Sequence, residues 1–217
     1  MISRRVPGRF ALGIGLGAAQ AFFAFTFRGP RPQFWQRMTL TGLSLGSFAL
    51  LTSGEARRLR IGPREVLLGL ASAGVQYVTF QIGDRMARRI MPAGDREIAD
   101  IYELRTLRPR AEIGARLAVI IGPAEEIFWR GALQAGFMRW LGRWPGTAAA
   151  TASYGGVHLV TGNLTLTGAA SVAGAHWALL YAAGVPLGAL IVSHAVWDVW
   201  IFLLQPTNAD PAQPIRG

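Results

Sequence analysis

The stretch FALGIGLGAAQAFFAFTF, residues 10–27, contains no Asp, Glu, Arg or Lys. A helix needs about 20 mainly apolar residues to cross the hydrocarbon core of a bilayer, and this stretch with its flanks reaches that length. Similar uncharged stretches recur along the chain, at residues 38–54, 66–83, 144–157, 164–185 and 186–197. The sequence therefore predicts an all-α protein, a multi-pass bundle of transmembrane helices.

The apolar stretches and their flanks predict about seven membrane helices. Their expected limits are residues 9–27, 34–54, 63–83, 113–139, 145–161, 164–183 and 186–205. The polar stretch 84–112 contains apolar residues near helical spacing, which predicts an amphipathic helix lying in the membrane interface. On this basis the chain divides into N-terminal membrane helices with an interfacial loop (1–112, the loop being 84–112), a helical core (113–205) and a C-terminal tail (206–217).

The charge pattern favours a lipid bilayer over nucleic acid as the partner. Only 16% of the residues are charged, against about a quarter in a typical soluble domain. The net charge is +10, but the arginines lie in short clusters between the apolar stretches, for example Arg57, Arg58 and Arg60. Such clusters are typical of loops that face anionic lipid headgroups, and no basic stripe on a soluble face indicates nucleic-acid binding. The absence of Cys excludes thiol catalysis, disulfides and thiolate metal sites.

Ionisable residues interrupt the apolar segments only in the second half of the chain. They are Glu125, Glu126, Arg130, His158, His176, His194 and Asp198. An Asp or Arg at the centre of a bilayer costs about 2.5–3.5 kcal/mol on the translocon scale. Such residues are retained where they pair with one another or line a hydrated cavity, so they indicate a functional site.

The spacing of the two adjacent glutamates gives them different partners. Glu126 and Arg130 are four residues apart with the acid first, which favours an ion pair on one helical face. Glu125 points about 100° away and has no partner on its own helix, so we expect it to remain for chemistry. The competing interpretation is that both acids follow Gly122-Pro123 at a helix N-terminus, where the helix dipole favours anions.

The histidines are weak evidence one at a time. His194 and Asp198 are four residues apart, so the carboxylate can orient the ring, fix its tautomer or join it as a metal ligand. His158 closes Tyr154-Gly155-Gly156-Val157-His158 on an otherwise apolar segment. His176 fits no such pattern and is expected to pack beside Trp177. Because the three ionisable patterns fall on three of the last four membrane helices, together they predict one buried site.

These residues resemble the signature of the CPBP (CAAX protease and bacteriocin-processing) family of intramembrane proteases. That signature is EExxxR, then FxxxH, then HxxxN or HxxxD. The matching residues are Glu125-Glu126-Ile127-Phe128-Trp129-Arg130, Tyr154-Gly155-Gly156-Val157-His158 and His194-Ala195-Val196-Trp197-Asp198. The resemblance covers about residues 113–200, whereas residues 1–112 match only as generic membrane helices. Two positions depart from the pattern, since Tyr154 replaces the usual Phe and Asp198 replaces the Asn of many members.

The resemblance implies an integral, multi-pass endopeptidase of a prokaryotic inner membrane, with residues 113–205 as its catalytic core. Its substrates would be peptides or proteins that are membrane-associated or processed at the C-terminus. Glu125 would act as general base on a water that His158 and His194 hold, with Glu126 and Arg130 as structural support. Where members have Asn at the position of Asp198, its amide is the donor to the oxyanion. An ionised Asp cannot donate, so Asp198 would have to be protonated for that role, or would act as a ligand or orienter instead.

The sequence leaves the metal and the activity itself open. Glu125, His158, His194 and Asp198 form a plausible set of nitrogen and oxygen ligands for Zn²⁺, while the absence of an HExxH pattern slightly favours a metal-free glutamate mechanism. No cofactor is therefore assigned with certainty. A catalytically silent scaffold or immunity factor would keep the same fold, and a proton-coupled transporter would also bury Glu, His and Asp. A transporter usually shows repeat symmetry, which this chain lacks.

Overall fold

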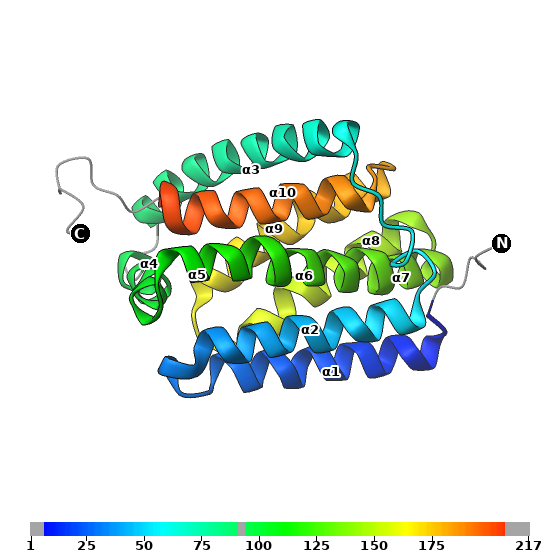
Figure 1. The fold of residues 1–217 in the computed structure, drawn as a ribbon, viewed down its shortest axis with the longest axis horizontal. Helices are drawn as coiled ribbons and strands as arrows, with labels where there is room; N and C mark the ends of the chain where they lie inside the picture. The colour runs from blue at the N-terminus through cyan, green and yellow to red at the C-terminus, as the bar shows by residue number, and fades with distance from the viewer. Residues whose placement is uncertain (1–6, 91–93, 207–217) are drawn as a thin grey trace.

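The protein is a bundle of helices, seen here as a computed structural model that describes residues 7–90 and 94–206 (Figure 1). The described residues contain no β-strand, which confirms the all-α prediction. The elements in chain order are α1 (Arg9–Phe27), η1 (Arg31–Gln33), α2 (Phe34–Thr52), α3 (Pro63–Ile90), α4 (Gly94–Glu103), η2 (Leu104–Leu107), α5 (Arg110–Ala115), η3 (Arg116–Ile121), α6 (Gly122–Phe128), η4 (Trp129–Gln134), α7 (Ala135–Leu141), α8 (Arg143–Val157), η5 (His158–Thr161), α9 (Leu164–Ala182), α10 (Leu187–Val199) and η6 (Trp200–Leu204). The predicted tail, apart from Pro206, lies outside the described residues.

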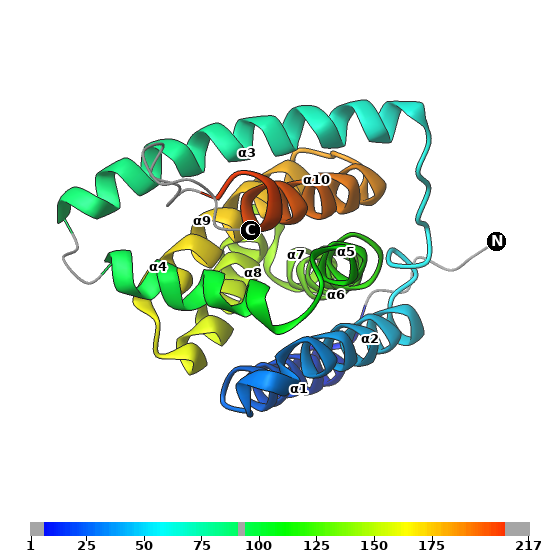
Figure 2. The same ribbon diagram turned by 60° about the vertical axis from the view of Figure 1, so that its left-hand side comes forward.

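The five elements from α5 to α7 follow one another without a break and form one long central helix, residues 110–141. Two of its sections, η3 and η4, have the wider π-helical turn, and they flank α6 on either side. The helix passes through the middle of the bundle, between the α1–α2 pair and α10 (Figure 2). This course places the section with Glu125 and Glu126 against neighbours on opposite sides.

Small residues allow α2 and α10 to approach the central helix closely. A Cβ atom added to Gly46 of α2 would lie 3.2 Å from the Ala124 Cβ atom. A Cβ atom added to Gly122 would lie 3.4 Å from the Cα atom of Ala195 in α10. Close approach through Gly and Ala is typical of helices that pack inside lipid.

Helix α3 lies on the outside of the bundle and packs mainly along α10 (Figure 2). At Gly69 an added Cβ atom would come within 2.6 Å of the Val192 Cβ atom, so the two helices leave no room for a side chain there. The prediction ended this helix at residue 83, but it continues to Ile90. The polar residues after Gly83 therefore extend a helix rather than begin a loop.

The amphipathic helix predicted within 84–112 is α4, and its apolar face packs on the protein. Ile98 and Tyr102 are buried. The Tyr102 hydroxyl donates to the Ile201 carbonyl at 3.1 Å, and the Trp35 indole N–H donates to the Leu104 carbonyl at 2.9 Å. The α4–η2 segment is thereby fixed across the ends of α2 and α10. Its sequence pattern predicted a helix with two faces but did not distinguish a lipid surface from a protein surface.

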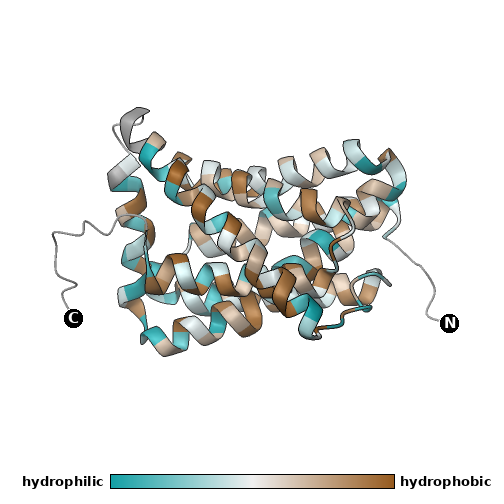
Figure 3. Cartoon of the chain, turned by 90° about the horizontal axis from the view of Figure 1, so that it is seen from above, coloured by the Kyte–Doolittle hydropathy of each residue, from teal (hydrophilic) through white to brown (hydrophobic). Residues whose placement is uncertain are grey.

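The apolar helices fit a membrane protein. Among the described residues, three helices are long and apolar enough to cross a bilayer, Arg9–Phe27, Pro63–Met86 and Leu187–Leu204. Hydrophobic positions run along the lengths of the helices (Figure 3). Large apolar side chains such as Leu67, Val75 and Val78 on α3 are exposed on the outside of the bundle. All seven predicted segments are helical, with limits within a few residues of those expected except at the end of α3.

Candidate active site

Three sections of the core supply the candidate residues. Glu125 and Glu126 lie on α6, His158 follows directly on α8, and His194 lies on α10. All four side chains are buried, and Asp198, one turn after His194, is 14% exposed. The structure therefore gathers side chains from distant parts of the sequence in the interior of the bundle.

Glu126 is the most heavily bonded carboxylate of the group. Its Oε1 atom accepts from the Arg130 guanidinium at 2.9 Å and from His194 Nδ1 at 2.7 Å. Arg130 also donates to the Gly174 carbonyl of α9 at 3.0 Å. The structure thus has the ion pair expected from the four-residue spacing. It adds a bond to His194 that the spacing could not predict, because the two residues lie on different helices.

Glu125 lacks a partner on its own helix but receives one from α8. The Tyr154 hydroxyl donates to Glu125 Oε2 at 2.8 Å. Sequence reasoning did not include Tyr154 among the site residues. The signal was its hydroxyl at a position where the family usually has Phe, since a buried hydroxyl needs a partner. The Arg130 guanidinium also faces the Tyr154 ring, 4.9 Å from its centroid.

The His158 ring is held by its own helix and by α1. Its Nδ1 atom lies 2.8 Å from the Tyr154 carbonyl oxygen, which can only accept, so the Nδ1–H donates. The Phe23 ring meets the imidazole edge to face, with centroids 5.1 Å apart, and Phe27 lies next to it. In the neutral ring this leaves Nε2 as the atom that can accept a proton or a hydrogen bond.

His194 faces a carboxylate at each ring nitrogen. Nδ1 bonds Glu126, and Nε2 lies 3.5 Å from Asp198 Oδ2. The shorter contact is with Glu126, so Glu126 is the stronger orienting group, although the sequence suggested Asp198. The Trp177 indole stacks on the same ring, with centroids 3.9 Å apart and planes 16° from parallel.

Hydrogen bonds join these residues into one site. Tyr154 connects α6 with the end of α8, because its hydroxyl donates to Glu125 and its carbonyl accepts from His158. Glu126, next to Glu125 in the chain, bonds His194 of α10, and His194 lies beside Asp198. His176 lies apart from this group, half-buried, and its Nε2 atom is 2.9 Å from the Ser72 hydroxyl.

The candidate residues do not form a ready metal site in this conformation. Among the residues that the structure describes, no three His, Asp or Glu side chains are grouped closely enough to hold one ion. Both nitrogens of His194 are directed at carboxylates of neighbouring side chains. Of the four residues considered for Zn²⁺, His158 has the ring nitrogen best placed for a further ligand, its Nε2 atom.

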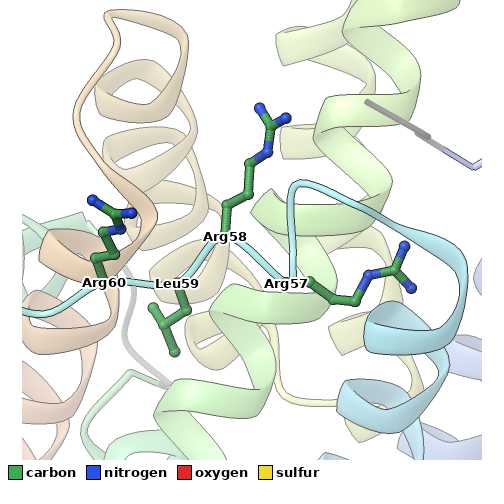
Figure 4. Close-up of a pocket in the computed structure, with 4 residues that line it drawn as sticks. All are labelled: Arg57, Arg58, Leu59 and Arg60. Atoms are coloured by element: carbon green, nitrogen blue, oxygen red, sulfur yellow. The ribbon is translucent and has the colours of Figure 1, made fainter. Parts of the chain in front are cut away.

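A surface hollow in the α2–α3 loop is separate from the site. It is lined by Arg57, Arg58, Leu59 and Arg60 (Figure 4). The three guanidinium groups point in different directions (Figure 4), so they do not converge on one anion. The arginine cluster is therefore a basic loop between α2 and α3, as its sequence indicates, and not a binding site for one anion.

Residues 111–200 match the family model described as type II CAAX prenyl endopeptidase, Rce1-like. We call residues 111–200 the Rce1-like segment. The finding confirms the CPBP resemblance, because the Rce1-like proteins are part of that family. The Rce1-like segment contains every candidate residue from Glu125 to Asp198, whereas α1 to α4 lie outside it. No curated protein and no solved structure matches the chain.

Proposed function

We propose that the protein is an intramembrane endopeptidase that hydrolyses peptide bonds with a water activated by Glu125. The observation that carries this proposal is a set of hydrogen bonds between three helices at one buried place: Tyr154 bonds both Glu125 and His158, and Glu126, next to Glu125, bonds His194. The match of residues 111–200 to the type II CAAX prenyl endopeptidase, Rce1-like model supports the same activity. Its substrates would be membrane-associated or C-terminally processed peptides.

In the proposed reaction Glu125 is the general base. Its carboxylate takes one proton from the water while the hydroxide oxygen bonds to the scissile carbonyl carbon. His158 Nε2 accepts a hydrogen bond from the attacking water, a donor on His194 stabilises the resulting oxyanion, and the C–N bond breaks as the amine takes the proton from Glu125. Tyr154 holds Glu125 before the reaction, and Glu126 with Arg130 fixes the orientation of His194. This sequence of steps needs no metal.

The membrane arrangement is part of the proposal. The seven predicted segments would each cross the bilayer, with the central helix as the fourth crossing and residues 113–205 as the catalytic core. Apart from the connection that contains α4 and η2, the predicted segments are joined by short connections, which supports successive crossings in opposite directions. The α4–η2 segment, with its polar outer face, would lie at the interface on one side.

The decisive experiment compares Glu125→Gln with the unchanged protein in proteoliposomes that contain a helical substrate peptide. We expect the variant to insert and fold but to cleave at least about 10³-fold more slowly, because the general base and its charge are both lost. The matched control is Glu103→Gln, an exposed acid paired with Arg31, which should cleave normally. Normal cleavage by Glu125→Gln would rule out the assignment, and proton or solute flux without cleavage would indicate a transporter.

A chelator such as 1,10-phenanthroline should leave cleavage unchanged, whereas inhibition reversed by Zn²⁺ would establish a metal mechanism.

A further inference from the structure

The orientation of His194 depends on the indole that covers it. The Trp177 side chain is fully buried, and its ring lies nearly parallel to the imidazole at 3.9 Å. The same indole lies against the Arg130 guanidinium, 5.3 Å from its carbon to the ring centroid. Trp177 therefore contacts both groups that donate to Glu126, and its position affects the two donors together.

The indole is itself fixed by a chain of hydrogen bonds that crosses three helices. Trp177 Nε1 donates to the Ser193 hydroxyl at 3.1 Å, and this hydroxyl lies 2.8 Å from that of Ser72. The Ser72 hydroxyl in turn lies 2.9 Å from His176 Nε2. This chain of hydrogen bonds starts and ends on α9 and passes through α10 and α3.

The hydrogen-bond chain has one direction in which every proton has an acceptor. An indole N–H can only donate, so the Ser193 oxygen accepts from Trp177. Ser193 then donates to the Ser72 oxygen, and Ser72 donates to His176 Nε2. In this direction both hydroxyls donate one bond and accept one, as buried polar groups require.

We infer that Ser72, Ser193 and Trp177 are positioning residues that hold the His194 ring with Nδ1 towards Glu126. The Glu126 bond fixes one atom of the imidazole but leaves it free to tilt about that contact. The stacked indole blocks the tilt, and the hydrogen bonds keep the indole in place. The inference rests on the proposed function, because it concerns the histidine that stabilises the oxyanion.

The inference gives a role to a helix outside the Rce1-like segment. Ser72 lies on α3, whereas Trp177, Ser193 and His194 lie within residues 111–200. A hydroxyl of the N-terminal helices thus supports the site through α10. His176, which no motif includes, becomes the end of the chain and the partner that satisfies Ser72.

The test measures kcat and KM for cleavage by the full-length protein in proteoliposomes. Trp177→Leu removes both the stacked ring and the N–H, and we expect kcat to fall about 10- to 100-fold with little change in KM, since misplacement of a reacting group by about 1 Å has an effect of that size. Trp177→Phe keeps an aromatic ring, so its kcat should lie between that of Trp177→Leu and that of the unchanged protein. Ser72→Ala should lower kcat by less, and Ser72→Thr, which restores the hydroxyl, should recover it.

The control is Trp35→Leu, because Trp35 is also a buried indole whose N–H is bonded, to the Leu104 carbonyl. It should leave kcat unchanged at equal thermal stability. A second readout needs no activity: in NMR of ring-labelled histidine, Trp177→Leu should move the His194 signals downfield as the indole ring current is lost. An unchanged kcat in Trp177→Leu, while Glu125→Gln is inactive, would overturn the inference and leave the proposed function standing. Normal cleavage by Glu125→Gln would instead remove the proposed function.

Discussion

The carboxylate of Glu126 lies in the interior of the protein, out of contact with solvent. One of its oxygens accepts from both Arg130 and His194, and the side chain is fully buried. A buried carboxylate is tolerated only while its partners remain, because removal of one partner leaves an uncompensated charge. We therefore expect the stability of the core to depend strongly on the Glu126–Arg130 ion pair.

Arg130→Met tests this dependence. The substitution keeps much of the side-chain volume but leaves Glu126 without its cation, so we expect a loss of about 3–5 kcal/mol in the free energy of unfolding. Denaturation in mixed detergent micelles, followed by circular dichroism, would measure it. Arg143→Met removes an exposed guanidinium instead and should change stability by less than about 0.5 kcal/mol. Equal stability of the two variants would contradict a buried ion pair.

Tyr154→Phe isolates the one hydroxyl that the family usually lacks. Loss of a hydrogen bond to a charged group costs about 1.5–3 kcal/mol, and the ring contact with Arg130 stays. We expect a protein that is less stable by this amount and cleaves a few-fold more slowly, in contrast to the inactive Glu125→Gln. Complete inactivity would show that the hydroxyl takes part in proton transfer and is more than a holder of Glu125.

At this scale the sequence identified the charged residues but only part of their bonding. The Glu126–Arg130 pair follows from helical spacing alone. The bonds from Tyr154 to Glu125 and from His194 to Glu126 join different helices, so no spacing within one segment predicts them. The stacking of Trp177 on His194 depends in addition on the rotation of α9 about its axis.

Helix α4 is attached to the bundle by a charged side chain as well as by its apolar face. Its Glu97 carboxylate accepts from the Thr165 hydroxyl and from the Thr165 backbone N–H, so it connects α4 to the first turn of α9. Both bonds favour the ionised form, and they lower the pKa of Glu97 from its ordinary value of 4.5. The contact thus stabilises the attachment of α4 only while the carboxylate is ionised.

The attachment of α4 should therefore weaken in acid. Because the folded pKa lies below the unfolded one, the stabilisation is fully present above pH 4.5 and is lost as the pH falls through the lowered value. A nitroxide on Asp100→Cys, an exposed position of α4 in a chain without other cysteines, would report the mobility of the helix by electron paramagnetic resonance. Glu97→Gln should give at pH 7 the mobility that the unchanged protein gains in acid, with little further pH dependence. A spectrum that is the same in both proteins at all pH values would contradict the contact.

The helices themselves were largely predictable, because uncharged runs of membrane length leave few alternatives for the backbone. Their partners were not. The pattern of α3 does not reveal that α10 is its main neighbour, and the amphipathic pattern of α4 does not reveal which surface its apolar face covers. Both depend on the packing of several segments at once.

For the whole molecule, the order of the helices fixes which connections share a side. The α2–α3 loop and the α7–α8 connection lie at one end of the bundle, and α4 lies at the other (Figure 1). The arginines of the connections do not decide which end faces the cytoplasm, since the longest polar stretch carries many of them and counts less.

Single cysteines would test this arrangement in intact vesicles with a maleimide that cannot cross the membrane. We expect Arg57→Cys and Arg143→Cys to react in intact vesicles, and Arg31→Cys and Asp100→Cys to react only after the vesicles are opened. In vesicles of the opposite orientation the two pairs should exchange behaviour. Permeabilised vesicles provide the control that each cysteine is reactive. Reaction of all four from the same side would contradict a bundle that spans the bilayer.

The wide π-helical turns of the central helix have a consequence for how the chain tolerates changes in length. A π turn holds the equivalent of one inserted residue within a single wide turn, so removal of one residue from η3 would leave an ordinary α-helix whose later part keeps nearly its present orientation. A deletion from α5, which has ordinary α-helical turns, would instead rotate everything beyond it by about 100°. Glu125 and Glu126 would then be carried away from their partners without any change in their own identity. We therefore expect the central helix to tolerate the loss of a residue from η3 better than the loss of one from α5.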